Sequence, residues 1–308
     1  MGRYILQRLV YMFLTVFLIA TLSFFLMKFL PGTPLSAADK LSEEQQQIVL
    51  EKYGLDDPVP VQYFNYMVGL AQGDMGISFQ FDNREVTDIL MTRLGPSMQL
   101  GFQAMFFGTI FGVLLGLVSA LYHNGPLDYG STFAAILGQS IPSFVFAGIL
   151  QYYVGVKLGW FPVALWGTWQ HTVLPTVALA IFPMAIAARF MRTEMLEVMG
   201  SDYITTARAK GINKFGVVFK HGVRNALIPL VTVLGPLAIG LITGTLVIEN
   251  IFAVPGLGEQ FVKSVNTNDF PIIMGTTLLI SVLFVTIVLI VDLLYGVIDP
   301  RIRLSEGE

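Results

Sequence analysis

Six stretches without a single charged residue run through the chain, and each is long enough to cross a membrane as a helix. About 20 helical residues span the roughly 30 Å of a bilayer's hydrocarbon core. Backbone polar groups in lipid must be satisfied within the segment, which favours helices over the short alternating strands of a barrel. The sequence therefore predicts an all-α polytopic membrane protein. The six transmembrane helices are expected at Leu9–Met27, Ser97–Tyr122, Tyr129–Val156, Thr172–Ala188, Asn225–Ile248 and Phe270–Val291.

Composition agrees with immersion in membrane lipid. Of 308 residues, 54% are hydrophobic and only 13% are charged, whereas soluble domains carry about 25% charge. The net charge of -3 offers no basic field for nucleic acid, so nucleic-acid binding is disfavoured. The chain has no cysteine, which excludes disulfides, thiolate metal sites and cysteine nucleophiles.

Basic residues predict the orientation, because Lys and Arg are retained in the cytoplasmic loops. The loop 189–224 is rich in them, the N-terminal segment holds Arg3 and Arg8, and the tail holds Arg301 and Arg303. The loops 157–171 and 249–269 offer only Lys157 and Lys263. We therefore expect both termini in the cytoplasm. The first span should be an uncleaved anchor, since its apolar core is longer than that of a secretory signal.

The chain divides by composition into three regions. Residues 1–30 hold the N-terminal segment and the first span, residues 31–96 form an acidic extracytoplasmic cap, and residues 97–308 form a five-helix core with a cytoplasmic loop at 192–225. In the cap, Ser42 and Gly54 are placed to begin and end a helix over Glu43–Tyr53. The cap either contacts a partner and shields an entrance, or is a structural plug.

The loop 200–229 is the most informative segment. Ser201 or Asp202 can cap a short helix, Gly211 can take the left-handed position that ends it, and Asn213 can cap a second helix. Small Ala207 and Ala209 alternate with Arg208 and Lys210, so another protein's acidic groove could approach closely. The alternative is a solvated loop whose basic residues only enforce topology.

At these residues the sequence resembles the EAA loop, which docks the membrane subunits of bacterial ABC importers onto their ATPases. The motif positions are Thr205, Thr206, Ala207 and Gly211, so the motif's Glu is missing, and Pro229 arrives about five residues late. Both departures are usual in the peptide and nickel importer branch, as are the strings Thr-Ala-Arg-Ala-Lys-Gly and Arg-Asn-Ala-Leu-Ile-Pro. Colinear strings such as Val254-Pro-Gly-Leu-Gly258 extend the resemblance over the whole chain. It is greatest to the B-type membrane subunits of oligopeptide permeases.

The resemblance implies a type I importer permease of the bacterial cytoplasmic membrane, surrounded by lipid, that imports peptides by alternating access. Oligopeptides are the expected cargo, with dipeptides, nickel or glutathione as alternatives. The implied partners are a homologous second permease subunit, two cytoplasmic ATPase subunits and an extracytoplasmic peptide-binding protein. The ATPase-coupling residues would be Thr205, Thr206, Ala207, Arg208, Ala209, Lys210 and Gly211.

No catalytic residue, cofactor site or metal site is expected in this chain. It lacks the Gly-x4-Gly-Lys-Ser/Thr phosphate loop, so ATP and Mg would be used by the partner ATPases. His171 and His221 have no second ligand at metal spacing. A self-sufficient channel or carrier, or an intramembrane enzyme, would need ionisable or nucleophilic groups inside the spans. The six spans carry no charged residue.

Several residues have two interpretations. Glu249 and Asp292 lie at span ends, where we expect carboxylates that reach the membrane interface rather than a gate. The stripe Gly108, Gly112 and Gly116 allows close helix contact, either at a subunit seam or inside the chain. Prolines within spans allow kinks; they are Pro142, Pro175, Pro183 and Pro229. No substrate-contacting residue is nominated.

Overall fold

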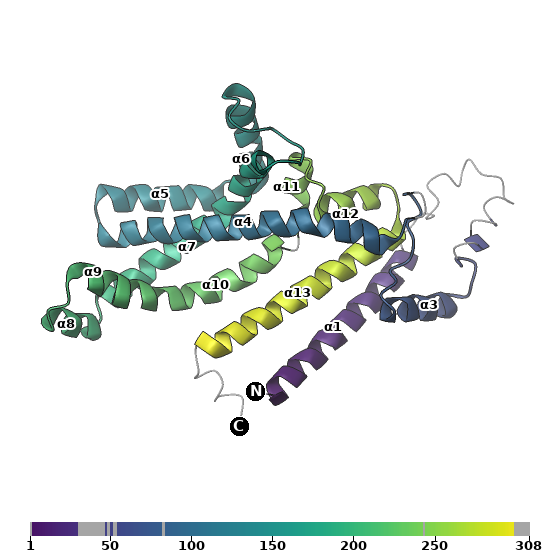
Figure 1. The fold of residues 1–308 in the computed structure, drawn as a ribbon, viewed down its shortest axis with the longest axis horizontal. Helices are drawn as coiled ribbons and strands as arrows, with labels where there is room; N and C mark the ends of the chain where they lie inside the picture. The colour runs from purple at the N-terminus through teal and green to yellow at the C-terminus, as the bar shows by residue number, and fades with distance from the viewer. Residues whose placement is uncertain are drawn as a thin grey trace. The chain divides into compact units, whose positions relative to one another are not determined.

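The computed structural model describes residues 2–29, 47, 50, 51, 54–81, 84–242 and 244–298. The described residues are almost wholly helical, and their one β-type feature is an isolated bridge between Ile77 and Glu85. The chain forms two compact units. The first comprises Met1–Pro96 and Pro255–Thr286, and the second comprises Ser97–Val254 and Ile287–Glu308. Figure 1 shows the elements in chain order.

The first unit is held together by residues that are far apart in the sequence. It contains α1 (Gly2–Phe29), α3 (Val59–Ala71), the start of α4 (Val86–Leu121), α12 (Leu257–Asn266) and the start of α13 (Phe270–Ile298). Its buried apolar cluster includes Val86 and Leu90 from α4, Leu257 from α12 and Ile272 from α13. Burial of these side chains therefore joins the start of α4 to the C-terminal part of the chain.

Polar contacts reinforce this packing. Asp269 is fully buried and accepts hydrogen bonds from the Ser78 hydroxyl at 2.5 Å and from the backbone N–H of Phe79 and Gln80. Arg93 forms an ion pair with Glu259 at 2.6 Å. A buried carboxylate is costly unless it is hydrogen-bonded, so these donors hold the 78–80 turn against the start of α13.

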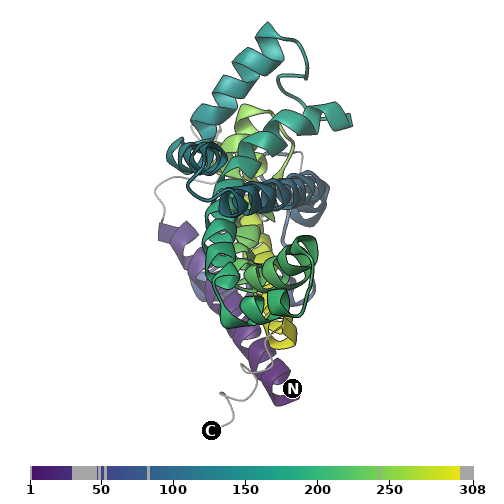
Figure 2. The ribbon, with the colours of Figure 1, turned by 90° about the vertical axis from the view of Figure 1, so that its left-hand side faces the viewer.

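The second unit is a bundle of helices and connecting segments around several small apolar clusters. In Figure 2, α6 and η2 extend away from the other helices of this unit. Its elements are α4 from Ser97, α5 (Pro126–Ser140), α6 (Ser143–Leu150), the π-helical η2 (Gln151–Lys157), α7 (Trp169–Met199), α8 (Asp202–Ala209), α9 (Lys214–Gly216), the π-helical η3 (Val217–Val223), α10 (Arg224–Ile242), α11 (Leu246–Ile251) and α13 from Ile287.

The glycine stripe of α4 faces α7 inside this unit. A Cβ atom would lie 2.7 Å from the Ala180 carbonyl oxygen at Gly108, 2.4 Å from that of Met184 at Gly112, and 2.4 Å from that of Ala188 at Gly116. Real Cβ atoms essentially never come so close to a backbone oxygen. Of the two interpretations left open by the sequence, the structure supports internal packing.

Among the described residues, four helices are long and apolar enough to span a membrane, and the number rises to six if each of two bent helix pairs counts as one span. The four lie in α1, α4, α7 and α13, and they confirm four of the predicted spans. Pro175 and Pro183 lie inside the continuous helix α7.

The prediction of one uninterrupted span over Tyr129–Val156 is wrong. The helix stops after Ser140, and the segments Pro126–Ser140 and Ser143–Lys157 meet at 105°. Ile141 is extended, with φ -82° and ψ 122°. The ring of Pro142 disfavours the helical conformation of the residue before it, which explains the break.

The predicted span Asn225–Ile248 is also interrupted. Helix α10 ends at Ile242, Gly244 adopts φ +109°, and a separate helix, α11, begins at Leu246. A φ of this sign is accessible mainly to glycine, so the helix cannot continue through this position. The second bent pair consists of Lys214–Leu227 and Thr232–Ile242, which meet at 62°.

Some sequence-based predictions fall outside the described residues. Of the predicted cap helix Glu43–Tyr53, only residues 47, 50 and 51 are described, and all three are helical. Gly54 adopts φ +62°, as expected for a glycine that ends a helix. The basic tail residues Arg301 and Arg303, and the side chain of Asp292, lie outside the described part.

Candidate functional site

The predicted coupling residues form a helix-turn-helix in the second unit, which we call the α8–α9 hairpin (residues 201–216). Helix α8 begins at Asp202, and Ser201 occupies the N-cap position with extended backbone. The Ser201 hydroxyl does not cap α8, however, because it donates to the Val198 carbonyl at 2.6 Å. The expected position of the helix start is confirmed, but the expected side-chain cap is not formed.

The turn after α8 has the geometry that the sequence predicts. Gly211 adopts φ +77°, and its N–H donates to the Arg208 carbonyl at 3.0 Å. The N–H of Ile212 donates to the Ala207 carbonyl at 3.3 Å. These two bonds are the pair that defines a Schellman motif, which satisfies the last carbonyl groups of a helix. The Asn213 side chain then accepts from the N–H of Gly216 at 2.7 Å and caps α9.

The two faces of α8 differ in character. Ile204 and Ala207 are buried against Val217. Ala207 therefore points inward, and the expectation that it is presented to a partner is wrong. The remaining residues of α8 and its turn are exposed: Asp202, Tyr203, Thr205, Thr206, Arg208, Ala209, Lys210 and Gly211. Small and cationic side chains thus project from a helix whose inner face is fixed by packing.

A cavity of about 460 Å³ lies beside the hairpin. Its apolar wall comes from the ends of α4 and α7 and from η3, and two cations, Arg208 and Lys214, also line it. The lining residues are Ala120, Leu121, Met199, Arg208, Ile212, Lys214, Val217 and Val218. The hairpin therefore offers an apolar recess with positive charge beside it, which is complementary to an apolar side chain flanked by carboxylates.

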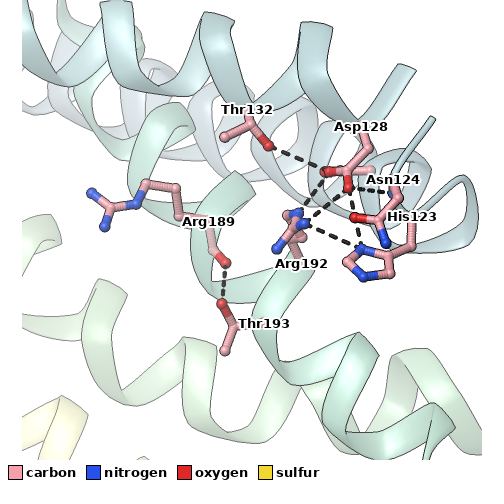
Figure 3. Close-up of polar contacts among 8 residues, drawn as sticks. His123, Asn124, Asp128, Thr132, Arg189, Arg192 and Thr193 are labelled. Carbon is pink, nitrogen blue, oxygen red and sulfur yellow. Dashed lines mark hydrogen bonds and ion pairs between the residues drawn. The ribbon is translucent and has the colours of Figure 1, made fainter. Parts of the chain in front are cut away.

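A buried ion pair lies farther back along the stem of the hairpin (Figure 3). The Asp128 side chain, in the first turn of α5, is only 2% exposed. Arg192 of α7 donates to both of its oxygens, from Nε at 2.7 Å and from a terminal nitrogen at 2.9 Å. Bidentate pairing fixes the orientation of both groups as well as their distance.

Residues of α4 and of the α4–α5 turn complete this cluster. The Ser119 hydroxyl donates to Asp128 at 2.5 Å, and the Asn124 N–H donates to it at 2.9 Å. The Nδ1 atom of His123 lies 3.2 Å from both Asp128 and Arg192. We call Ser119, His123, Asn124, Asp128 and Arg192 the Asp128 cluster. It joins α4, α5 and α7 at one point.

Sequence reasoning missed this cluster. Arg192 is one of the basic residues used for the orientation, and Asp128 has no predicted role. One feature of the sequence could have pointed to it: Asp128 is a lone acidic residue at the start of an apolar span, and the chain also has a segment rich in basic residues that could pair with it. Charge pattern alone does not identify Arg192 as the partner, because the two residues are 64 positions apart.

The stem that joins the Asp128 cluster to α8 is the end of α7. Met191 and Met195 on this stem are fully buried. They pack with Leu117 of α4, Val218 of η3 and Ala226 of α10. The hairpin is therefore attached to the bundle by packing on several sides.

Two of the other candidate residues, Glu249 and His171, have hydrogen-bond partners within the chain. Glu249 is only 1% exposed, and it accepts from the Ser97 hydroxyl at 2.8 Å and from the N–H of Thr245 at 3.1 Å. The expectation that its carboxylate reaches the membrane interface is wrong, because the carboxylate is buried and accepts these hydrogen bonds at the start of α11. His171 contacts the Thr168 hydroxyl through Nδ1 at 2.9 Å. Within the described residues, no group of His, Asp and Glu is arranged to hold a metal ion.

A second cavity, of about 550 Å³, lies between α4, α6 and α7 and is almost entirely apolar. Phe107, Phe146 and Trp169 line it, and its polar residues include Gln103 and Thr176. These two bind each other, since the Thr176 hydroxyl donates to the Gln103 carbonyl oxygen at 3.0 Å. The cavity therefore offers little polar binding capacity.

Comparison with known families gives two matches that together cover most of the chain. Residues 112–304 match the family described as binding-protein-dependent transport system inner membrane component. Residues 1–101 match the N-terminal region described for such membrane components.

Curated relatives match along their whole length. The chain is 47% identical to the dipeptide transport system permease protein DppB of Lactococcus lactis subsp. cremoris, over 99% of this chain and 100% of the relative. It is 44% identical to DppB of Bacillus subtilis, over 99% of both chains. It is 38% identical to the oligopeptide transport system permease protein OppB of Escherichia coli, over 98% of this chain and 100% of the relative.

Solved structures share the fold. One is an inward-facing form of the MetNI methionine ABC transporter, with a TM-score of 0.57 and 19% identity over 68% of this chain and 96% of that chain. Another is an amino acid ABC transporter with histidines, with a TM-score of 0.54 and 18% identity over 68% of this chain and 94% of that chain.

Proposed function

The chain belongs to the family of inner membrane components of binding-protein-dependent transport systems, and from this premise we propose that it forms one half of the membrane pathway of an ATP-driven peptide importer. Relatives that match over their whole length are named for dipeptide or oligopeptide transport. In this proposal the chain is a translocation subunit and not an enzyme.

The observation that carries the proposal is the exposed face of the α8–α9 hairpin. A short helix with small and cationic exposed residues is fixed by a buried inner face and by the Schellman turn at Gly211. A solvated loop that only enforced topology would need neither the packed inner face nor the adjoining cavity. We assign this face to a cytoplasmic ATPase subunit, with Thr205, Thr206, Arg208, Ala209, Lys210 and Gly211 at the contact.

Energy enters the membrane pathway through this contact. The chain has no phosphate-binding loop, so ATP and Mg are bound by two ATPase partners. When ATP closes the ATPase pair, the hairpin moves with it and the pathway opens outward. This coupling requires the hairpin to contact the two ATPase arrangements with different free energies, because equal contacts shift no equilibrium.

The remaining partners complete the pathway. A homologous second permease subunit forms the other wall, and an extracytoplasmic peptide-binding protein delivers the cargo. Both termini and the hairpin lie in the cytoplasm in this arrangement, in accordance with the basic residues near them.

Peptides are the proposed cargo. Oligopeptides are the expectation from the sequence, and dipeptides are the alternative that the names of two relatives suggest. Peptides of both lengths carry a charged amino end and a carboxylate, so they differ mainly in the number of residues between these ends. A comparison of the uptake rates of a labelled dipeptide and a labelled pentapeptide therefore tests the preferred cargo length.

The proposal is tested by purifying this chain from its native membrane in mild detergent. We expect a second six-span subunit and two phosphate-loop ATPases to accompany it. The complex is then placed in liposomes with the binding protein, and labelled peptide uptake is measured with ATP inside the vesicles. Vesicles that contain a non-hydrolysable ATP analogue instead of ATP serve as the control.

Two results would contradict the proposal. Recovery of the chain as a lone homo-oligomer would favour a channel or carrier. Peptide uptake by vesicles that contain this chain alone would show that it needs no ATPase partner.

A further inference from the structure

We propose that the Asp128–Arg192 pair is a positioning device that makes α5 move with α7 as one body, so that displacement of the hairpin reaches α5 and α6. The inference rests on the proposed function, because it concerns how motion of α8 is transmitted. Neither residue contacts the cargo or the nucleotide in this proposal.

The pair joins the first turn of α5 to the part of α7 that leads into the hairpin. Arg192 lies about two turns before the end of α7, and α8 begins directly after the short 200–201 connection. Asp128 lies in the first turn of α5. A displacement of α8 can therefore reach the start of α5 through this bidentate contact (Figure 3).

The geometry of the cluster resists rotation and sliding. The two oxygens of Asp128 accept from different nitrogens of Arg192, and each also has a partner from α4 or the α4–α5 turn. A carboxylate near a helix N-terminus is further stabilised by the helix dipole of α5. Separating the helices would leave a buried charge without its donors, which is strongly unfavourable.

Close packing continues the attachment along the two helices. Ala135 of α5 is buried with Ala185 and Ala188 of α7. A Cβ atom built on Gly138 would lie 3.3 Å from the Cβ of Ala185. Arg189 also binds the side chain of Gln139. Small side chains keep the helices in contact, while the ion pair fixes their register.

Stability alone does not explain why a charged pair, Asp128 and Arg192, joins α5 to α7. Buried ion pairs can often be replaced by apolar residues of similar volume without loss of stability. A small or apolar pair at these positions could hold the helices together, but it would not fix their register as a bidentate pair does.

The first test replaces the pair and measures coupling. Asp128→Asn, Arg192→Gln and the charge exchange Asp128→Arg with Arg192→Asp are purified as full complexes and compared with wild type. Arg224→Gln is the matched control, since Arg224 is an exposed arginine of the same unit that lies on α10 and not on α5 or α7. The readout is the amount of peptide imported per ATP hydrolysed, at equal assembly of the complex.

We expect the single variants to import about fivefold less peptide per ATP or worse, in line with typical coupling free energies. Partial rescue by the charge exchange and unchanged coupling in Arg224→Gln are also expected. A purely structural role would lower assembly and leave the ratio unchanged, and this result would overturn the proposal.

The second test does not depend on whether the first variants fold. The natural chain has no cysteine, so Gly138→Cys with Ala185→Cys introduces a single pair. The 3.3 Å separation of the Cβ positions is close to the roughly 3.5–4.5 Å of disulfides. If α5 and α7 move as one body, oxidation of this pair leaves ATP-driven uptake unchanged.

Loss of uptake on oxidation, restored by a reductant, would show that the helices separate during transport and would overturn the proposal. Failure of wild-type complexes to import any peptide would instead refute the proposed function, and the inference with it.

Discussion

At the scale of single residues, glycines are required in the turn after α8 and in the contact between α4 and α7, for two different physical reasons. Gly211 is needed for its backbone conformation, because φ is +77° and no atom lies within 4 Å of a Cβ built there. Gly112 is needed for space, because its Cβ would meet the Met184 carbonyl oxygen at 2.4 Å. Substitutions at the two sites should therefore have different effects.

We expect Gly211→Val to reduce transport while the chain still inserts and assembles. Left-handed backbone costs a β-branched residue about 1–2 kcal/mol, and the strain falls on the turn that holds α8. Uptake and ATP hydrolysis by reconstituted complexes are the measurements. Gly211→Asn is the matched control, since Asn tolerates this conformation. Normal transport by Gly211→Val would show that the turn does not position α8.

We expect Gly112→Val to destabilise the second unit by about 1–3 kcal/mol, the usual cost of overpacking. The apparent Tm of the purified protein in detergent measures this change. Gly130→Val on α5 is the control, because a Cβ there has no atom within 4 Å. An equal Tm for both variants would contradict the close approach of α4 and α7.

At the scale of elements, the α8–α9 hairpin is largely built from local signals. Gly211 and Asn213 define its turn, and both roles were predicted from residue type and spacing. The direction in which Ala207 faces was predicted wrongly, since it depends on the packing of Ile204 and Val217. The periodicity of so short a helix does not show which side another element will cover.

We expect Arg208→Glu with Lys210→Glu to weaken binding of the ATPase partner. Each exposed charge contact contributes about 0.3–1 kcal/mol, so affinity should fall by about 3- to 30-fold. Binding of purified ATPase to the chain in nanodiscs, at low and high salt, measures this loss. Lys220→Glu is the control, as an exposed cation on η3 outside α8. Equal affinities for all three proteins would exclude α8 from the contact.

At the scale of the whole molecule, the orientation in the membrane is a prediction from the distribution of basic residues between loops. The chain's lack of cysteine makes single-cysteine labelling in intact cells direct. We expect Lys210→Cys to react with an impermeant maleimide only after the cells are opened, because the proposed function places the hairpin in the cytoplasm. Gly167→Cys, exposed and without close neighbours, should react in intact cells. If Lys210→Cys reacts in intact cells and Gly167→Cys does not, the hairpin lies outside the cell, where it cannot contact cytoplasmic ATPases.

What the sequence by itself determined is the local and repetitive part of this protein. Uninterrupted apolar runs predict membrane helices wherever they occur, because lipid requires every backbone group to be paired within the segment. Helix ends at Gly211 and Asn213 depend on a few neighbouring residues, and so does the family resemblance of the motif around them. Even the break at Ile141–Pro142 was locally encoded, since the proline excludes helix from the residue before it.

The tertiary structure alone decided which distant residues meet. Asp128 and Arg192 are 64 positions apart, Ser78 and Asp269 are 191 apart, and neither pair follows from charge or spacing. The glycine stripe of α4 had two possible partners until α7 was found against it. The physical reason is that such contacts depend on the simultaneous packing of several helices. A residue's own type limits what it can bind, and the fold selects its partner.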